Sequence, residues 1–134
     1  MIVADANLIA YFAIEGERTP ASRQVFAKDR VWIAPELWRA EMLSILAGRI
    51  RRKEDTLEGA EQDYLYAESL MRSNTYPVDF RRVLAVVAQT GCSGYDSQYI
   101  ALAEERRVKL VTTDGGILEN AKHVAVSPGQ FLAA

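Results

Sequence analysis

The alternation of short apolar runs with longer helical patterns constrains the fold of this chain more than any other feature. Candidate strands occupy residues 1–4, 31–34, 75–78, 109–113 and 123–126, and most lack a strict alternation of apolar and polar side chains. Such runs are typical of strands buried on both faces. Because helical segments separate them, the sequence predicts an α/β fold, a three-layer α/β/α sandwich with a central, mainly parallel sheet of about five short strands.

Residues that favour helix ends mark the segments between these runs. Helices are expected over residues 19–28, 36–52, 55–72, 79–91 and 95–107, and a further helix follows Asp5. Pro20 and Pro35 suit helix starts, and Asp55 with Glu58 fits a capping box. No repeat or Pro/Gly/Ser-rich linker interrupts the pattern, so we expect one domain over residues 1–134.

Composition narrows the classes of function. The 16 Lys and Arg residues against 18 Asp and Glu give a net charge of −2, which disfavours binding of nucleic acid by bulk charge. Cys92 is the only cysteine, and no signal peptide or long apolar run is present, so we expect no intrachain disulfide, no membrane association and a cytoplasmic location. His123 is the only histidine, which disfavours Ser/His/Asp catalysis and histidine-rich zinc sites; both it and Cys92 are expected to be structural.

Four acids stand where the flanking pattern turns side chains inward. Asp5 and Asp114 follow predicted strands, at the sheet edge where open parallel sheets form their sites. Glu41 is at helical spacing from Leu37, Trp38 and Ile45, and Asp96 is at helical spacing from Tyr99, Ile100 and Ala103. A buried carboxylate needs a partner, so these positions are candidates for a functional site.

Each acid also has an ordinary explanation. Asp5 could cap the helix after it, and Glu41 could form an ion pair with a nearby arginine. Asp96 could form a capping box with Ser93, and Asp114 could be a turn residue. The combination is more specific, because several like charges brought together repel one another unless a cation or proton compensates. Carboxylates without thiolates or imidazoles favour Mg²⁺ or Mn²⁺, as one ion or two.

Four segments carry a resemblance to a known family: residues 2–9, 35–43, 95–103 and 110–114. In their order and spacing the chain resembles PIN domains, a small metal-dependent nuclease fold, and specifically the VapC-type toxins of type II toxin–antitoxin pairs. The resemblance implies that the four acids, Asp5, Glu41, Asp96 and Asp114, bind the metal and catalyse cleavage, with Asn7 and Thr112 as polar helpers. It implies a ribonuclease that hydrolyses phosphodiester bonds with metal-activated water. Some family members carry a further acid where this chain has Gly115 and Gly116, which makes a complete second metal site doubtful.

The resemblance also implies partners. It suggests a homodimer, and a groove among the second to fourth helices that receives the carboxyl-terminal segment of an antitoxin, whose arginine would enter the acidic pocket. Large apolar residues in this region are mostly expected in the core. Arg49, Arg51, Arg52 and Lys53 form the one dense basic run; they could contact RNA, or they could simply complement the dipole at a helix end.

Three alternatives stay open. The chain could be a housekeeping PIN nuclease without an antitoxin, or an inert interaction protein with the same fold. A metal-binding signalling module of the receiver type also places aspartates at strand ends, but it needs adjacent acids after the first strand, where this chain has Asp5 and Ala6.

Overall fold

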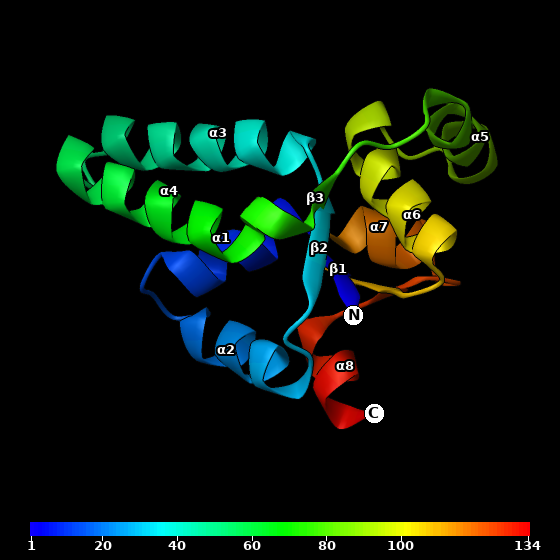
Figure 1. Ribbon diagram of the computed structural model, residues 1–134, viewed down its shortest axis with the longest axis horizontal. Coiled ribbons are helices and arrows are strands. Elements are labelled where there is room, and N and C mark those ends of the chain that lie inside the picture. Colours follow the sequence, from blue (N-terminus) through cyan, green and yellow to red (C-terminus); the bar gives the residue numbers. More distant parts are fainter.

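A parallel sheet of five short strands organises the computed structural model, which describes residues 1–134 (Figure 1). The strand order is β3-β2-β1-β4-β5, and every neighbouring pair is parallel. The strands are β1 (Ile2–Ala4), β2 (Trp32–Pro35), β3 (Thr75–Tyr76), β4 (Lys109–Val111) and β5 (Ala125–Val126). Every residue of β1 and β2 is buried, which confirms for these two strands that the apolar runs are covered on both faces, whereas both residues of β3 are only partly buried.

Helices cover both faces of this sheet, as Figure 1 shows. On one side lie α1 (Ala6–Ala13), α2 (Thr19–Lys28), α3 (Leu37–Arg51) and α4 (Leu57–Met71). On the other side lie α5 (Phe80–Thr90), α6 (Gly94–Arg106) and α7 (Gly115–Asn120). A 3₁₀ turn, η1 (Arg72–Asn74), leads into β3, and α8 (Pro128–Ala133) packs beside α2. The predicted α/β/α sandwich is confirmed, and no helix is long and apolar enough to cross a membrane.

The connections around β1 create a switch point in the sheet. From β1 the chain passes outward through β2 to β3, then returns to β4 on the other side of β1 and continues outward to β5. β1 and β4 are adjacent strands, and the segments that follow them therefore diverge from each other. In open parallel sheets, ligands bind in the crevice between two such segments. Strand order 3-2-1-4-5 also differs from the 2-1-3-4-5 order of receiver domains, which removes the signalling-module alternative.

One apolar core of 31 buried residues fills the space between sheet and helices. Trp32 packs edge-on against Phe12 and Phe26, with ring centroids 5.5 Å apart in both pairs. Trp38 is fully buried, and its indole nitrogen donates a hydrogen bond to the Thr75 hydroxyl at 2.9 Å. Cys92 is a free, buried member of the same cluster, which agrees with a packing role.

Several helix boundaries differ from the expectations. Pro35 is the last residue of β2 rather than the start of a helix, and α3 begins at Leu37. The cap of α4 is Thr56, whose hydroxyl accepts from the Gly59 amide at 3.0 Å; the expected capping box from Asp55 is wrong. Asp55 instead lies 3.8 Å from Arg49.

Two short helices were not expected from the sequence. Asp114 caps α7, and Ser127 with Gln130 forms a complete capping box at the start of α8. In both cases the glycine or proline at the helix start is also typical of a turn, so the sequence did not indicate a helix. The capping side chain nevertheless supplies the hydrogen bonds that a helix start needs.

Candidate metal-binding and catalytic site

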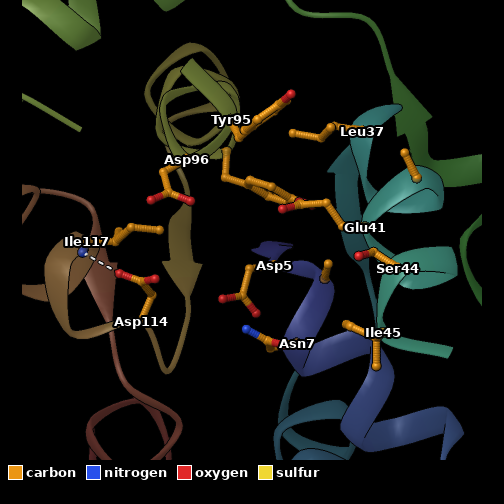
Figure 2. A pocket seen from close by; sticks show the side chains of 13 residues that line it. Asp5, Asn7, Leu37, Glu41, Ser44, Ile45, Tyr95, Asp96, Asp114 and Ile117 are labelled. Atoms are coloured by element: carbon orange, nitrogen blue, oxygen red, sulfur yellow. Dashed lines mark hydrogen bonds between the residues drawn. The ribbon is translucent and has the colours of Figure 1, made fainter. Parts of the chain in front are cut away.

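The four predicted acids line one cleft of about 600 Å³ at the switch point (Figure 2). Asp5 directly follows β1, Asp114 directly precedes α7 after β4, Glu41 lies in α3 and Asp96 in α6. Figure 2 shows their side chains pointing toward a common space. The thirteen lining residues include no lysine, arginine or histidine, and none of the four acids forms a salt bridge.

Asp5 is the most buried of the four, with 5% of its surface exposed. One carboxylate oxygen accepts from the Leu8 amide at 2.8 Å, which caps α1, and the other accepts from the hydroxyl of fully buried Thr112. Burial raises the pKa of Asp5 to about 6; these two hydrogen bonds lower it, whereas the charges of Glu41 and Asp114 raise it further. The capping explanation is therefore correct, but it uses only one of the two oxygens.

Thr112 joins the two strand ends of the cleft. Its hydroxyl donates to Asp5 and accepts from the Asp114 amide at 3.0 Å, so one side chain fixes both aspartates. Asp114 itself caps α7 by accepting from the Ile117 amide at 2.9 Å, the bond drawn in Figure 2. Asp114 is thus a helix cap rather than a plain turn residue, and its carboxylate still faces the cleft.

Glu41 is half-buried and is bonded to a tyrosine rather than to an arginine. The Tyr99 hydroxyl donates to Glu41 Oε1 at 2.6 Å, whereas neighbouring Arg39 forms its ion pair with Glu68 at 2.9 Å. The ion-pair explanation for Glu41 is therefore wrong. Burial raises the pKa of Glu41, the Tyr99 hydrogen bond lowers it, and the charge of Asp96 raises it. Burial and the bond to Glu41 also raise the pKa of Tyr99, which keeps its hydroxyl protonated as the donor.

Asp96 lies in the first turn of α6 and faces Asp114 across the cleft. The Ser93 hydroxyl accepts from the Asp96 amide at 3.0 Å and caps the helix, but the carboxylate does not bond the Ser93 amide, so the capping box is incomplete. Burial raises the pKa of Asp96, as does the charge of Asp114, and hydrogen bonding to Ser93 lowers it. The carboxylate faces the cleft.

The remaining expected residues divide between the cleft and the surface. Asn7 lines the cleft from α1 but makes no hydrogen bond to the four acids. The basic run lies at the far end of α3. Its first residue, Arg49, is roughly 12 Å along the helix axis from Glu41. Arg49 and Arg52 are engaged with Asp55 and Glu54, and no residue of this run lines the cleft.

Sequence reasoning missed three contributors to the cleft. Tyr99 holds Glu41, Tyr95 stands exposed at the rim, and Ser44 lies one turn beyond Glu41 on α3. The i+3 spacing from Glu41 could have identified Ser44. Trp38, although at helical spacing from Glu41, lies in the core and does not line the cleft. His123 is not part of the cleft; its Nε2 lies 2.6 Å from Glu104.

The donor set fits a hard divalent cation. Carboxylate and hydroxyl oxygens are its ordinary ligands, and an added positive charge would offset the burial and the mutual repulsion that raise the pKa values of the acids. No three of the acids converge closely enough to ligate one ion together. An ion here would take one or two carboxylates and complete its shell with water, as Mg²⁺ commonly does.

Fold and cleft together define a class: parallel α/β proteins with an acidic crevice at the switch point of the sheet. Within that class, a profile of the PIN domain matches residues 2–123, so the chain belongs to the PIN domain family. PIN domains are nucleases, and they generally use divalent metal ions. By sequence, the chain matches no curated protein.

Solved structures with the same fold extend over nearly the whole chain. PAE2754 from Pyrobaculum aerophilum has a TM-score of 0.77 at 19% identity, over 98% of this chain and 86% of that one. FitAcB from Neisseria gonorrhoeae has a TM-score of 0.68 at 18% identity, over 96% and 99%. A toxin–antitoxin complex from Klebsiella pneumoniae has a TM-score of 0.67 at 16% identity, over 96% and 98%. At these identities the similarity establishes the fold.

Proposed function

We propose that this protein is a Mg²⁺- or Mn²⁺-dependent endoribonuclease, and that it is the toxin of a toxin–antitoxin pair in the cytoplasm. One observation carries the nuclease proposal: four carboxylates from four separate elements line one cleft without a cationic partner. Repulsion among them is tolerated in a folded protein when a cation bound in the cleft offsets it. Membership of a nuclease family supports the same conclusion.

The residues have distinct roles in this proposal. Asp5 and Asp114, fixed by Thr112, are the two carboxylates that would hold the ion, and Glu41, bonded to Tyr99 through one oxygen, would accept from a water molecule of the ion's shell. A bound divalent ion would lower the pKa of a water molecule and stabilise charge on the phosphodiester oxygens. Asp96, whose pKa is raised, is suited to accept the proton from the attacking water, although Glu41 is a second candidate. Gly115 and Gly116 add no further acid, which favours one ion.

Cleavage of labelled single-stranded RNA tests this proposal. Wild-type protein should cut in Mg²⁺ or Mn²⁺ and stop in excess chelator. Asp96→Asn should lose the activity yet remain folded, because Ser93 caps α6 through the Asp96 amide and not its carboxylate. Glu105→Gln is the matched control, since Glu105 is an exposed acid on the same helix outside the cleft.

Undiminished cleavage by Asp96→Asn, or cleavage that persists in chelator, would contradict these assignments. A protein that binds the ion but cuts no RNA would instead favour the inert alternative.

The toxin role rests on the neighbours and on a second surface. One neighbour is described as a toxin–antitoxin complex, and this chain has a groove of about 550 Å³ between α3 and α4 that suits an apolar segment. Leu43, Leu57 and Leu65 line the groove, and each exposes more than half of its surface. The antitoxin would cover these residues and place an arginine among the carboxylates of the adjacent cleft.

Growth of cells that express the protein separates a toxin from a housekeeping nuclease. Wild type should arrest growth, Asp96→Asn should not, and coexpression of a cognate antitoxin should restore growth. Leu57→Glu should abolish this rescue without changing RNA cleavage, because Leu57 is remote from the acids. Growth unaffected by an active nuclease would favour the housekeeping alternative. Sedimentation velocity tests the expected homodimer.

Exposed members of the basic run are proposed to contact RNA phosphates. Arg51 and Lys53 form no ion pair, unlike Arg49 and Arg52. Replacing both with glutamine should flatten the salt dependence of RNA affinity, and an unchanged slope would assign them to the helix end alone.

A further inference from the structure

A second cavity, of about 320 Å³, adjoins the acidic cleft along the same edge of the sheet. At three places, consecutive residues of the chain line the two cavities: Asn7 and Leu8, Thr113 and Asp114, and Ile117 and Leu118. In each pair, one residue lines the acidic cleft and the other lines the second cavity. A polymer bound across the cleft would therefore reach the second cavity within a short length of chain.

The two cavities have opposite charge. The acidic cleft has four carboxylates and no cation, whereas Arg18 is the one charged residue that lines the second cavity. Arg18 forms no salt bridge and no side-chain hydrogen bond, while Glu15 nearby is already paired with Arg23 at 2.9 Å. The guanidinium of Arg18 thus remains available to an anion.

Tyr11 places this guanidinium over the cavity. The Arg18 guanidinium carbon lies 5.2 Å from the centroid of the Tyr11 ring, a geometry that favours stacking. The Tyr11 hydroxyl lies 3.5 Å from the Thr113 hydroxyl, so the ring spans from α1 to the segment that carries Asp114. The Ser127 hydroxyl accepts from the Gln130 amide and keeps its own proton for another acceptor.

A nuclease substrate needs such a counterpart to the acids. Each nucleotide of RNA carries a negative phosphate, and phosphates next to the scissile bond would be repelled by carboxylates unless a cation holds them. The basic run on α3 does not line the cleft, so its free members, Arg51 and Lys53, would reach only phosphates farther from the scissile bond. Arg18 is instead an unpaired cation in a cavity that shares its wall with the cleft.

We propose that the Tyr11–Arg18 cavity binds the single-stranded RNA substrate beside the scissile bond, with Arg18 contacting a phosphate. The hydroxyls of Thr113 and Ser127 offer further hydrogen bonds to phosphate or ribose oxygens, and the Tyr11 ring orients the guanidinium. This inference rests on the proposed ribonuclease function and assigns a substrate subsite to it.

Arg18→Gln tests the subsite, with Arg23→Gln as the matched control. Both arginines lie at or near the start of α2 and are exposed, but Arg23 is paired with Glu15 and does not line the cavity. Arg18 precedes α2 without a side-chain capping bond, so its replacement leaves the helix start intact. Affinity for a fluorescent single-stranded RNA is measured in Mg²⁺ in the Asp96→Asn background, which should not cut the probe.

Arg18→Gln should weaken RNA binding about fivefold and reduce the slope of log affinity against log salt by about 0.7, the value for one phosphate on a single strand. Arg23→Gln should change neither. In the active protein, Arg18→Gln should raise KM more than it lowers kcat, because the contact is equal in ground and transition states. Mn²⁺ affinity without RNA should be unchanged.

Two outcomes would overturn the proposal in different ways. If wild type cuts RNA but Arg18→Gln and Arg23→Gln bind it with equal affinity and slope, the subsite is wrong and the nuclease function stands. If wild type neither binds nor cuts RNA in Mg²⁺ or Mn²⁺, the ribonuclease function fails, and the subsite fails with it. Tyr11→Leu provides a second variant: it should reproduce part of the Arg18→Gln loss, and wild-type affinity would reject the role of the ring.

Discussion

Replacing Asp5 with asparagine is expected to stabilise the metal-free protein while removing a proposed metal ligand. Burial raises the pKa of Asp5 from its usual 3.8 to about 6. One pKa unit corresponds to about 1.4 kcal/mol, so ionised Asp5 disfavours the folded state by about 3 kcal/mol at neutral pH. Asparagine avoids this cost and can still accept from the Leu8 amide and donate to Thr112.

The sign of the pH dependence follows from the raised pKa. Below pH 3.8 Asp5 is neutral in both states, and its ionisation costs nothing. Between pH 3.8 and about 6 the unfolded chain releases the proton while the folded protein retains it, so wild type loses stability as the pH rises. The advantage of Asp5→Asn should therefore be about 2 to 3 kcal/mol at pH 7.5 and should shrink toward zero near pH 4.

Urea unfolding followed by circular dichroism, in excess chelator at several pH values, measures this difference. Added Mg²⁺ at 100 times its dissociation constant should then stabilise wild type by about 2.7 kcal/mol and leave Asp5→Asn almost unaffected. The reasoning would be refuted if Asp5→Asn were less stable than wild type in chelator at pH 7.5, or if the difference did not change with pH.

Three further variants test individual contacts. Tyr99→Phe removes the donor to Glu41 and should weaken Mn²⁺ binding about tenfold without unfolding the protein, as measured by electron paramagnetic resonance. The control is Tyr95→Phe, which should bind Mn²⁺ as wild type does because the Tyr95 hydroxyl has no partner. Equal losses of affinity in the two variants would reject a positioning role for Tyr99. Thr112→Val leaves the Asp5 carboxylate and the Asp114 amide without this partner and should lower the free energy of unfolding in urea by about 2 kcal/mol. Thr112→Ser keeps the hydroxyl and should retain most of this stability. Thr56→Ala should lower the free energy of unfolding by about 1 kcal/mol, because it removes the cap of α4. If Asp55→Ala lowers the free energy of unfolding more than Thr56→Ala does, Asp55 is the cap after all.

Much of this architecture is predictable from the sequence, because local chemistry dictates it. The apolar stretch at residues 2–4 identifies a strand buried on both faces, and Gly91, with φ of 73°, ends α5 as its lack of a side chain allows. Asp5 and Asp114 meet because parallel strands bring their carboxyl ends to one edge.

Contacts between distant segments are less accessible to sequence reasoning. The bond from Tyr99 to Glu41 joins residues 58 positions apart, and no local pattern distinguishes it from an ion pair with an arginine. Capping and ligand roles also proved compatible: Asp5 and Asp114 each cap a helix and line the cleft, because a carboxylate has two oxygens and a cap uses one.

The central position of β1 determines when the cleft can first exist during synthesis. Its two neighbours enter the sheet from opposite parts of the chain: β2 follows after some thirty residues, but β4 belongs to residues 109–111. A ribosome-bound nascent chain therefore exposes one flank of β1, and Asp5 lacks Thr112 as its partner, until translation has passed Asp114. Products that stop short of β4 lack Thr112 and Asp114 and therefore cannot assemble all four acids in one cleft.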